Sequence, residues 1–384
     1  MEAAGPDIPF FRLDLDDEDI ASVVSVLRGG WLTAGPQVAA FEDEFEQFMG
    51  EGVRAVAVAS NTAGMHLALE ALGIAQGDEV IVPTLTFTAT AEVVRALGAD
   101  VVFVDIDPQT LCIDPDKIAE AITPRTRAIM PVHFGGLPCD MGRIYALAEP
   151  HGIHVVDDAA HALPASIDGV HVGAGASDAA VFSFYANKTI TTGEGGMIVS
   201  RNESLIERCK LTRFHGIDRD SFDRSAPDLA KLCYDVVAPG FKYNMNDMAA
   251  SLGRTQLSRA HDFHTRRQHI AARYHDGVAG LPLTLPAWPK SHQTHSWHLY
   301  PIQFHDRAAR DRFLEHLSRH GVGFSIHYRP LHQMTYWRER NNLRDDQFPV
   351  ATRYAERCVS LPIFASMRDD EIARVIDVVQ AAFH

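Results

Sequence analysis

Residues 55–63 read AVAVASNTA, an apolar run that ends at a serine and an asparagine. The first four residues are typical of a buried strand, and the polar pair after them is typical of a helix start. A helical pattern follows to about residue 73. One strand followed by one helix is the unit from which a parallel sheet is built.

The same unit repeats along the next hundred residues. Strand-like runs recur at roughly 22–27-residue spacing, each with a helical pattern after it. They lie at 79–82, 101–104, 128–132 and 153–158. This alternation predicts an α/β protein with a mostly parallel sheet wrapped by helices, in which ligands bind at the carboxyl ends of the strands.

The pattern changes in the second half of the chain. A polar stretch at 217–235 predicts a mobile loop, and a long helical pattern at 246–276 predicts a helix that crosses to a second domain. Residues 299–383 then alternate between strands, including one at 323–327, and helices. We therefore expect an α+β C-terminal domain.

A single lysine stands out in residues 183–196, which read SFYANKTITTGEGG between two further strand-like runs at 179–182 and 197–199. Lys188 lies in a small bend rich in hydroxyl groups and glycines. Apolar surroundings lower the pKa of a lysine and make it a nucleophile, and glycines let the backbone approach a bulky ligand. The alternative is an ordinary surface lysine, which needs no such setting.

Three other strand ends carry polar or aromatic residues that suit a ligand. The helix start after Ser60 suits an anion, although taken alone it is more typical of an ordinary helix cap. Asp158 ends an apolar strand, where a carboxylate needs a partner, while Asp157 should point to the opposite face. Phe87 could stack on a flat ring or pack in the core. The hydroxyl of Ser183 could join a phosphate site.

Composition excludes several classes of function. The chain has 384 residues, 46% hydrophobic and 22% charged, which is ordinary for a globular protein of two domains. A net charge of −15 argues against nucleic acids and anionic membranes as partners. No apolar run is long enough to span a membrane, and no signal peptide is expected. The 20 histidines are scattered, so no metal site is predicted.

Five cysteines, an odd number without any CxxC pair, favour reduced thiols and a cytoplasmic location. Neither GxGxxG after the first strand nor GxxxxGK[ST] occurs, so a plain nucleotide-binding module is disfavoured.

A phosphate cradle, a ring-stacking aromatic, an acid for a ring nitrogen and a reactive lysine together describe a pyridoxal 5'-phosphate (PLP) site. In order and spacing, the chain resembles the PLP-dependent nucleotide-sugar aminotransferases of the DegT/DnrJ/StrS family. The stretches that carry the resemblance are 31–36, 60–63, 83–90, 158–161, 183–196, 240–245 and 327–332. The resemblance implies PLP fold type I, with a seven-stranded, mostly parallel sheet in a large domain (1–252) and a smaller α+β domain (253–384).

The resemblance also implies roles for individual residues. Lys188 binds PLP covalently and Asp158 pairs with the ring nitrogen. The other residues implied to bind the cofactor are Thr62, the backbone of Ala63, Phe87, His161 near the 3-hydroxyl, Ser183, and Lys242 or Asn244 reaching the phosphate of a neighbouring subunit. His215, His327 and Tyr328 are expected to line the substrate entrance.

The implied reaction moves an amino group from L-glutamate to a nucleotide-linked keto-sugar, most similar to members that aminate a 4-keto sugar. Shared sites imply a homodimer. The alternatives are a 3-aminotransferase, a dehydratase of the same family, and a PLP-binding regulatory protein without catalysis. The dehydratase branch carries His at the position of Lys188, which favours aminotransfer.

Overall fold

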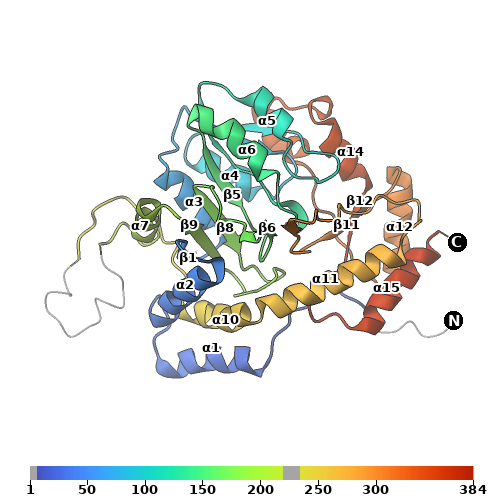
Figure 1. Ribbon diagram of the computed structural model, residues 1–384, viewed down its shortest axis with the longest axis horizontal. Coiled ribbons are helices and arrows are strands. Elements are labelled where there is room, and N and C mark those ends of the chain that lie inside the picture. The colour runs from blue at the N-terminus through green and yellow to red at the C-terminus, as the bar shows by residue number, and fades with distance from the viewer. Residues whose placement is uncertain (1–6, 219–233, 384) are drawn as a thin grey trace.

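The protein is described by a computed structural model that covers residues 7–218 and 234–383 (Figure 1). Most of the stretch predicted as a mobile loop, 217–235, lies outside these residues. Within them, no helix is long and apolar enough to cross a membrane.

One seven-stranded sheet organises the first two thirds of the chain. Its strand order is β1 (Arg54–Val58), β9 (Gly196–Ser200), β8 (Ala179–Ser183), β5 (His154–Asp158), β4 (Thr126–Ile129), β2 (Glu79–Pro83) and β3 (Asp100–Val104). All neighbouring pairs are parallel except those of β9, which runs antiparallel to both β1 and β8. The predicted α/β class and mostly parallel sheet are therefore confirmed.

Helices cover both faces of this sheet (Figure 1). One face packs against α3 (Asn61–Ala71), α4 (Ala89–Ala96), α5 (Pro115–Ala121), α6 (Met141–Ala148) and α7 (Glu203–Thr212). The other face packs against α2 (Pro36–Met49) and α10 (Asp247–Ser258), with α1 (Asp17–Gly29) outside α10.

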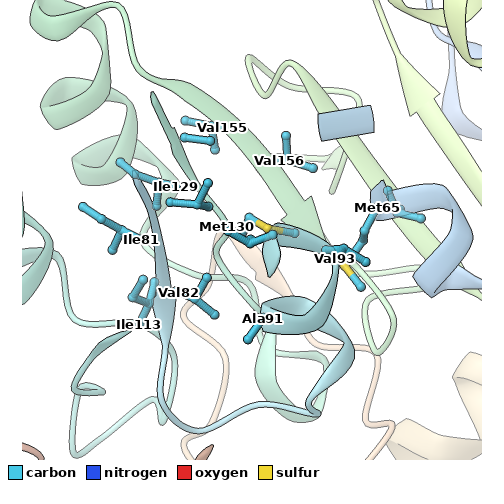
Figure 2. Close-up of a cluster of buried hydrophobic side chains, with 14 of the residues drawn as sticks. Met65, Ile81, Val82, Ala91, Val93, Ile113, Ile129, Met130, Val155 and Val156 are labelled. Carbon is cyan, nitrogen blue, oxygen red and sulfur yellow. The ribbon is translucent and has the colours of Figure 1, made fainter. Parts of the chain in front are cut away.

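Strand β1 shows how the sequence produces two buried faces. Val56 and Val58 belong to the apolar cluster on one face, part of which is drawn in Figure 2, and Ala55 and Ala57 belong to the cluster on the other. Side chains alternate along a strand, so a continuous apolar run fits a strand that is covered on both sides. Each fully buried valine or leucine contributes about 1.5–3 kcal/mol to the hydrophobic driving force.

The C-terminal third forms a separate apolar cluster around Tyr274, Tyr300 and Val375. This cluster is built from α11 (Ala260–Gly277), β11 (Tyr300–Gln303), α12 (Arg307–Arg319), β12 (Cys358–Leu361) and α15 (Asp369–Ala381). The buried residues of α13 (Thr335–Asn341) and α14 (Pro349–Arg357) join the cluster on one face of the large sheet instead. This confirms an α+β arrangement. The predicted domain boundary after residue 252 falls inside α10 and stays a prediction.

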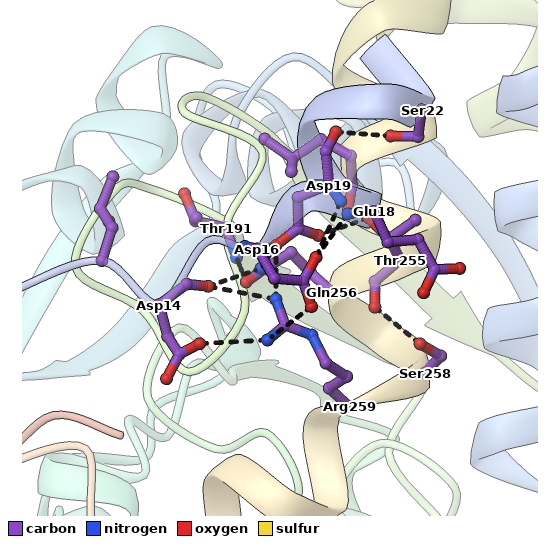
Figure 3. Close-up of polar contacts among 12 residues, drawn as sticks. Asp14, Asp16, Glu18, Asp19, Ser22, Thr191, Thr255, Gln256, Ser258 and Arg259 are labelled. Atoms are coloured by element: carbon purple, nitrogen blue, oxygen red, sulfur yellow. Dashed lines mark hydrogen bonds and ion pairs between the residues drawn. The ribbon is translucent and has the colours of Figure 1, made fainter. Parts of the chain in front are cut away.

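Three predicted elements differ from the structure. The helix expected over 246–276 is two helices that meet at Arg259, where φ is −101° and ψ 3°. The guanidinium of Arg259 pairs there with Asp14 and Asp19, which ties α10 to the residues before and within α1 (Figure 3).

The strand expected at 323–327 does not form, and within that range only Ser325 makes an isolated bridge, to Ser360. The strand expected at 128–132 runs from Thr126 to Ile129. Pro131 has no N–H to give to the ladder, and beyond it Val132 makes only an isolated bridge with Asp158.

Candidate active site

A cavity of about 450 Å³ opens at the carboxyl ends of the parallel strands. This is where the strand pattern predicts ligands to bind. Its lining comes from five separate regions of the chain, namely Ser60–Thr62, Thr86–Ala89, Asp158–His161, Ser183–Gly195 and His327–Tyr328, together with Val132.

The start of α3 forms one wall. The Ser60 hydroxyl accepts a hydrogen bond from the Ala63 N–H at 3.1 Å, so Ser60 is a helix cap as well as a lining residue. A Cβ atom on Gly196 would lie 2.7 Å from the Asn61 nitrogen and 2.7 Å from the Ser60 carbonyl carbon. Glycine at this position therefore allows β9 to pack directly against the backbone at the start of α3.

Asp158 is almost completely buried at the end of β5, with 4% of its surface exposed. Its Oδ2 accepts a hydrogen bond from the Thr90 hydroxyl at 2.8 Å, and its Oδ1 accepts one from the Ala160 N–H at 3.2 Å. The amide of Asn61 donates to the same Oδ1 at 3.5 Å. Burial raises the pKa of Asp158, and the hydrogen bonds from Thr90 and Ala160 oppose that shift by stabilising the carboxylate.

Asp157 does not line the cavity. Both of its oxygens accept from the Ser177 hydroxyl at 2.9 Å, and His133 lies 3.5 Å from Oδ2. The two neighbouring aspartates thus face opposite sides of the sheet, as strand alternation requires.

Lys188 lies in the bend between β8 and β9 and lines the same cavity. Burial of its amine lowers the pKa of Lys188 to about 8, and the nearby Asp158 carboxylate limits this shift. The bend is held by Thr191, whose hydroxyl donates to the Phe184 carbonyl at 3.2 Å and whose N–H donates to Gln256 at 3.4 Å. Gln256 in turn bonds to Asp19 of α1 (Figure 3).

A group of aromatic rings closes another side of the cavity. Tyr328 and the Nε2 of His161 are 3.2 Å apart, and the His161 Nδ1 accepts from the Gly135 N–H at 3.3 Å. Nδ1 is therefore unprotonated and Nε2 carries the hydrogen. Burial lowers the pKa of His161 well below its usual value, so this ring is neutral. Phe87 is 60% exposed, which leaves its face available for stacking.

Eight of the residues singled out from the sequence are brought together by the fold, and they are Thr62, Phe87, Asp158, His161, Ser183, Lys188, His327 and Tyr328. Ala63 is adjacent, but its N–H is taken by Ser60. His215, Lys242 and Asn244 do not line this chain's cavity. They lie beside one another, since the His215 N–H donates to the Phe241 carbonyl and Lys242 donates to Asn244.

Sequence reasoning missed four residues. Asn61 and Thr90 lie in stretches that were singled out, but nothing in the sequence shows that they bond to Asp158. The ring of His298 lies 4.3 Å from that of His161. Arg267 faces Lys188 from the middle of a helix, where arginines are mostly exposed.

This arrangement fits PLP. It offers a helix start and hydroxyls for a phosphate, an exposed ring face for stacking, a buried carboxylate for a pyridine nitrogen, and an amine with a lowered pKa within one cavity. Within residues 7–218 and 234–383, no cluster of three or more histidines, cysteines or carboxylates is placed to hold a metal ion.

Comparisons with known proteins agree with this chemistry. Residues 13–380 match the DegT/DnrJ/EryC1/StrS aminotransferase family. Spr1654 from Streptococcus pneumoniae, described as a sugar aminotransferase and solved in its PMP form, is 31% identical with a TM-score of 0.92, covering 98% of this chain and 99% of that one.

Two further structures are similar over almost their whole length. DesV from S. venezuelae, solved in complex with a ketimine intermediate, is 34% identical with a TM-score of 0.90, covering 99% of both chains. PseC from Helicobacter pylori, an aminotransferase involved in pseudoaminic acid biosynthesis, is 28% identical with a TM-score of 0.89, covering 98% of this chain and 99% of that one. The chain described here therefore belongs to the DegT/DnrJ/EryC1/StrS aminotransferase family and is a PLP-dependent sugar aminotransferase.

Proposed function

We propose that this enzyme transfers the amino group of L-glutamate to a nucleotide-linked keto-sugar, with a 4-keto sugar as the acceptor. The observation that carries the proposal is that Lys188 and Asp158 face one cavity of about 450 Å³, with the lysine pKa lowered to about 8. The lowered pKa increases the neutral fraction of the amine, and transamination requires from the protein an amine that can become neutral and a paired carboxylate.

When bound, PLP supplies an electron sink that is deepened by a proton on its ring nitrogen. Asp158 keeps that proton in place as a carboxylate, supported by Thr90. Phe87 would stack against the ring, and the hydroxyls of Thr62 and Ser183 would bind the phosphate. The N–H of Ala63, which the resemblance assigns to the phosphate, is held by Ser60 in this structure. His161 contacts the 3-hydroxyl.

Lys188 has two tasks in this proposal. First, its neutral nitrogen would bond to the cofactor. Second, once the donor has displaced it, the lysine amine would take the proton from the donor's Cα and give it to the cofactor carbon that is bonded to the transferred nitrogen. His327 and Tyr328 line the cavity, which supports their proposed role in contacting the substrates. The acceptor reaction then reverses these proton movements on the keto carbon.

We also propose a homodimer with shared sites. The basic and amide side chains of Lys242 and Asn244 suit a phosphate, yet they do not line the cavity of their own chain. His215 lies beside them. A two-fold interface would deliver these residues to the partner's site, twice per dimer. The four described cysteines are buried and free, which supports a reducing, cytoplasmic location.

Turnover with L-glutamate and a panel of nucleotide keto-sugars tests the function, with product regiochemistry determined by NMR. We expect an amine at C4, and we expect Lys188→Ala to remain folded but lose turnover by several orders of magnitude. An amine at C3 or a deoxy product would identify one of the other family activities. Binding of PLP without any amine product would indicate a regulatory protein, and near-normal turnover by Lys188→Ala would overturn the assignment.

A further inference from the structure

Arg267 of α11 is a buried cation that has no counter-ion among residues 7–218 and 234–383. Only 3% of its surface is exposed, and its Nη1 donates to the carbonyl oxygens of Trp297 at 3.2 Å, His298 at 3.5 Å and Ile363 at 2.8 Å. Its buried Nε has no hydrogen-bond partner. Within the described part of the chain no carboxylate pairs with it, and burial lowers the pKa of Arg267 to about 10, which leaves it charged at neutral pH.

Arg267 and Lys188 line the same small cavity of about 20 Å³, which is distinct from the main one and has room for about one water molecule. The other charged side chains of this cavity are already paired. Arg12 lies 2.6 Å from Glu371, and Asp14 lies 3.0 Å from Arg259. Among the charged side chains that line this small cavity beside Lys188, Arg267 is therefore the cation that no carboxylate compensates.

The other titratable groups that face Lys188 add little positive charge to its surroundings. Burial lowers the pKa values of His161, His298 and His327, so these rings are neutral. On the opposite side, Asp158 favours a charged lysine. That carboxylate is the group proposed above to pair with the ring nitrogen of PLP, which leaves Arg267 as the main opposing charge.

We propose that Arg267 is a positioning residue that acts through Lys188, where its charge disfavours a second positive charge on the lysine nitrogen and keeps that nitrogen reactive. Two like charges in surroundings of low polarity repel each other strongly, and the repulsion is relieved when the lysine nitrogen loses its proton. The inference rests on the proposed role of Lys188 as the residue that binds PLP.

The test is a pH titration of the holoenzyme, followed through the visible absorbance band of the cofactor bound to Lys188. Arg267→Gln removes the charge but keeps N–H groups for the carbonyls, Arg267→Met removes both, and Arg267→Lys keeps the charge. We expect the first two variants to raise the pKa of the lysine–cofactor nitrogen by on the order of one unit, and Arg267→Lys to stay near the parent.

Arg266→Met is the matched control. Arg266 is the next residue on the same helix, but its guanidinium bonds to the Met367 carbonyl and to Asp369 instead. We expect this variant to titrate like the parent.

Three results would overturn the inference. They are an unchanged titration in a folded Arg267→Gln or Arg267→Met enzyme, a shift in Arg267→Lys as large as in Arg267→Gln, and an equal shift in Arg266→Met. Failure of the underlying function looks different, because the parent enzyme itself would then show no visible band from bound cofactor.

Discussion

At the scale of single residues, two adjacent aspartates have different roles, because Asp158 faces the cavity and Asp157 faces the opposite side of the sheet. We expect Asp158→Asn to bind PLP more weakly and to slow both half-reactions, because a neutral amide cannot hold a proton on the ring nitrogen. Asp157→Asn should affect cofactor binding much less, since Asp157 bonds to Ser177 behind the sheet. PLP affinity and turnover with glutamate measure both, and the opposite order of effects would assign the role to Asp157.

The hydroxyl of Thr90 gives a second prediction. It donates to Asp158 and opposes the rise of that pKa, so Thr90→Val should raise the Asp158 pKa further and favour its protonated form. A lost hydrogen bond to a charged group costs about 1.5–3 kcal/mol, which corresponds to PLP binding that is weaker by about tenfold or more. Thr90→Ser should restore the parental affinity. Equal affinity in Thr90→Val and the parent would show that Asp158 does not need this bond.

At the scale of elements, the close contact between β9 and the start of α3 is possible because Gly196 has no side chain. A Cβ on Gly196 would meet backbone atoms of Ser60, Asn61 and Phe182 at 2.7–2.9 Å, and backbone cannot move aside cheaply. We expect Gly196→Ala to lower the free energy of unfolding by about 1–3 kcal/mol and to weaken PLP binding, because the wall that should hold the phosphate is displaced.

Urea unfolding and PLP titration measure these two effects. Gly29→Ala is the control, since a Cβ on Gly29 would meet nothing within 4 Å. If both alanine variants matched the parent in stability and PLP affinity, the close contact between β9 and α3 would have no energetic importance.

At the scale of the whole molecule, the homodimer can be tested by complementation. Neither Lys188→Ala nor the double variant Lys242→Ala/Asn244→Ala should be active alone if sites are shared. A mixed dimer contains one site with both defects and one intact site, so activity should return to about half of the parent per heterodimer. If subunits exchange but no activity returns from two inactive parents, each chain builds its own site.

The sequence by itself determined the fold class and the stretches that come together around one cavity. The repeated strand and helix signals depend on local periodicity, which is why strands such as β1 and β2 were placed within one or two residues. The residues at strand ends could be recognised because parallel strands deliver their carboxyl ends to one edge. The motif order around Lys188 and Asp158 then identified the cofactor.

Only the tertiary structure decided how these groups are supported. The break at Arg259 depends on ion pairs with residues about 240 positions away, and the bond from Thr90 to Asp158 joins the start of α4 to the end of β5. Arg267 looks like an ordinary exposed arginine until α11 packs against the segments that carry Trp297 and Ile363. Burial, charge pairing and the pKa of Lys188 follow from contacts between distant segments, and local sequence patterns do not contain that information.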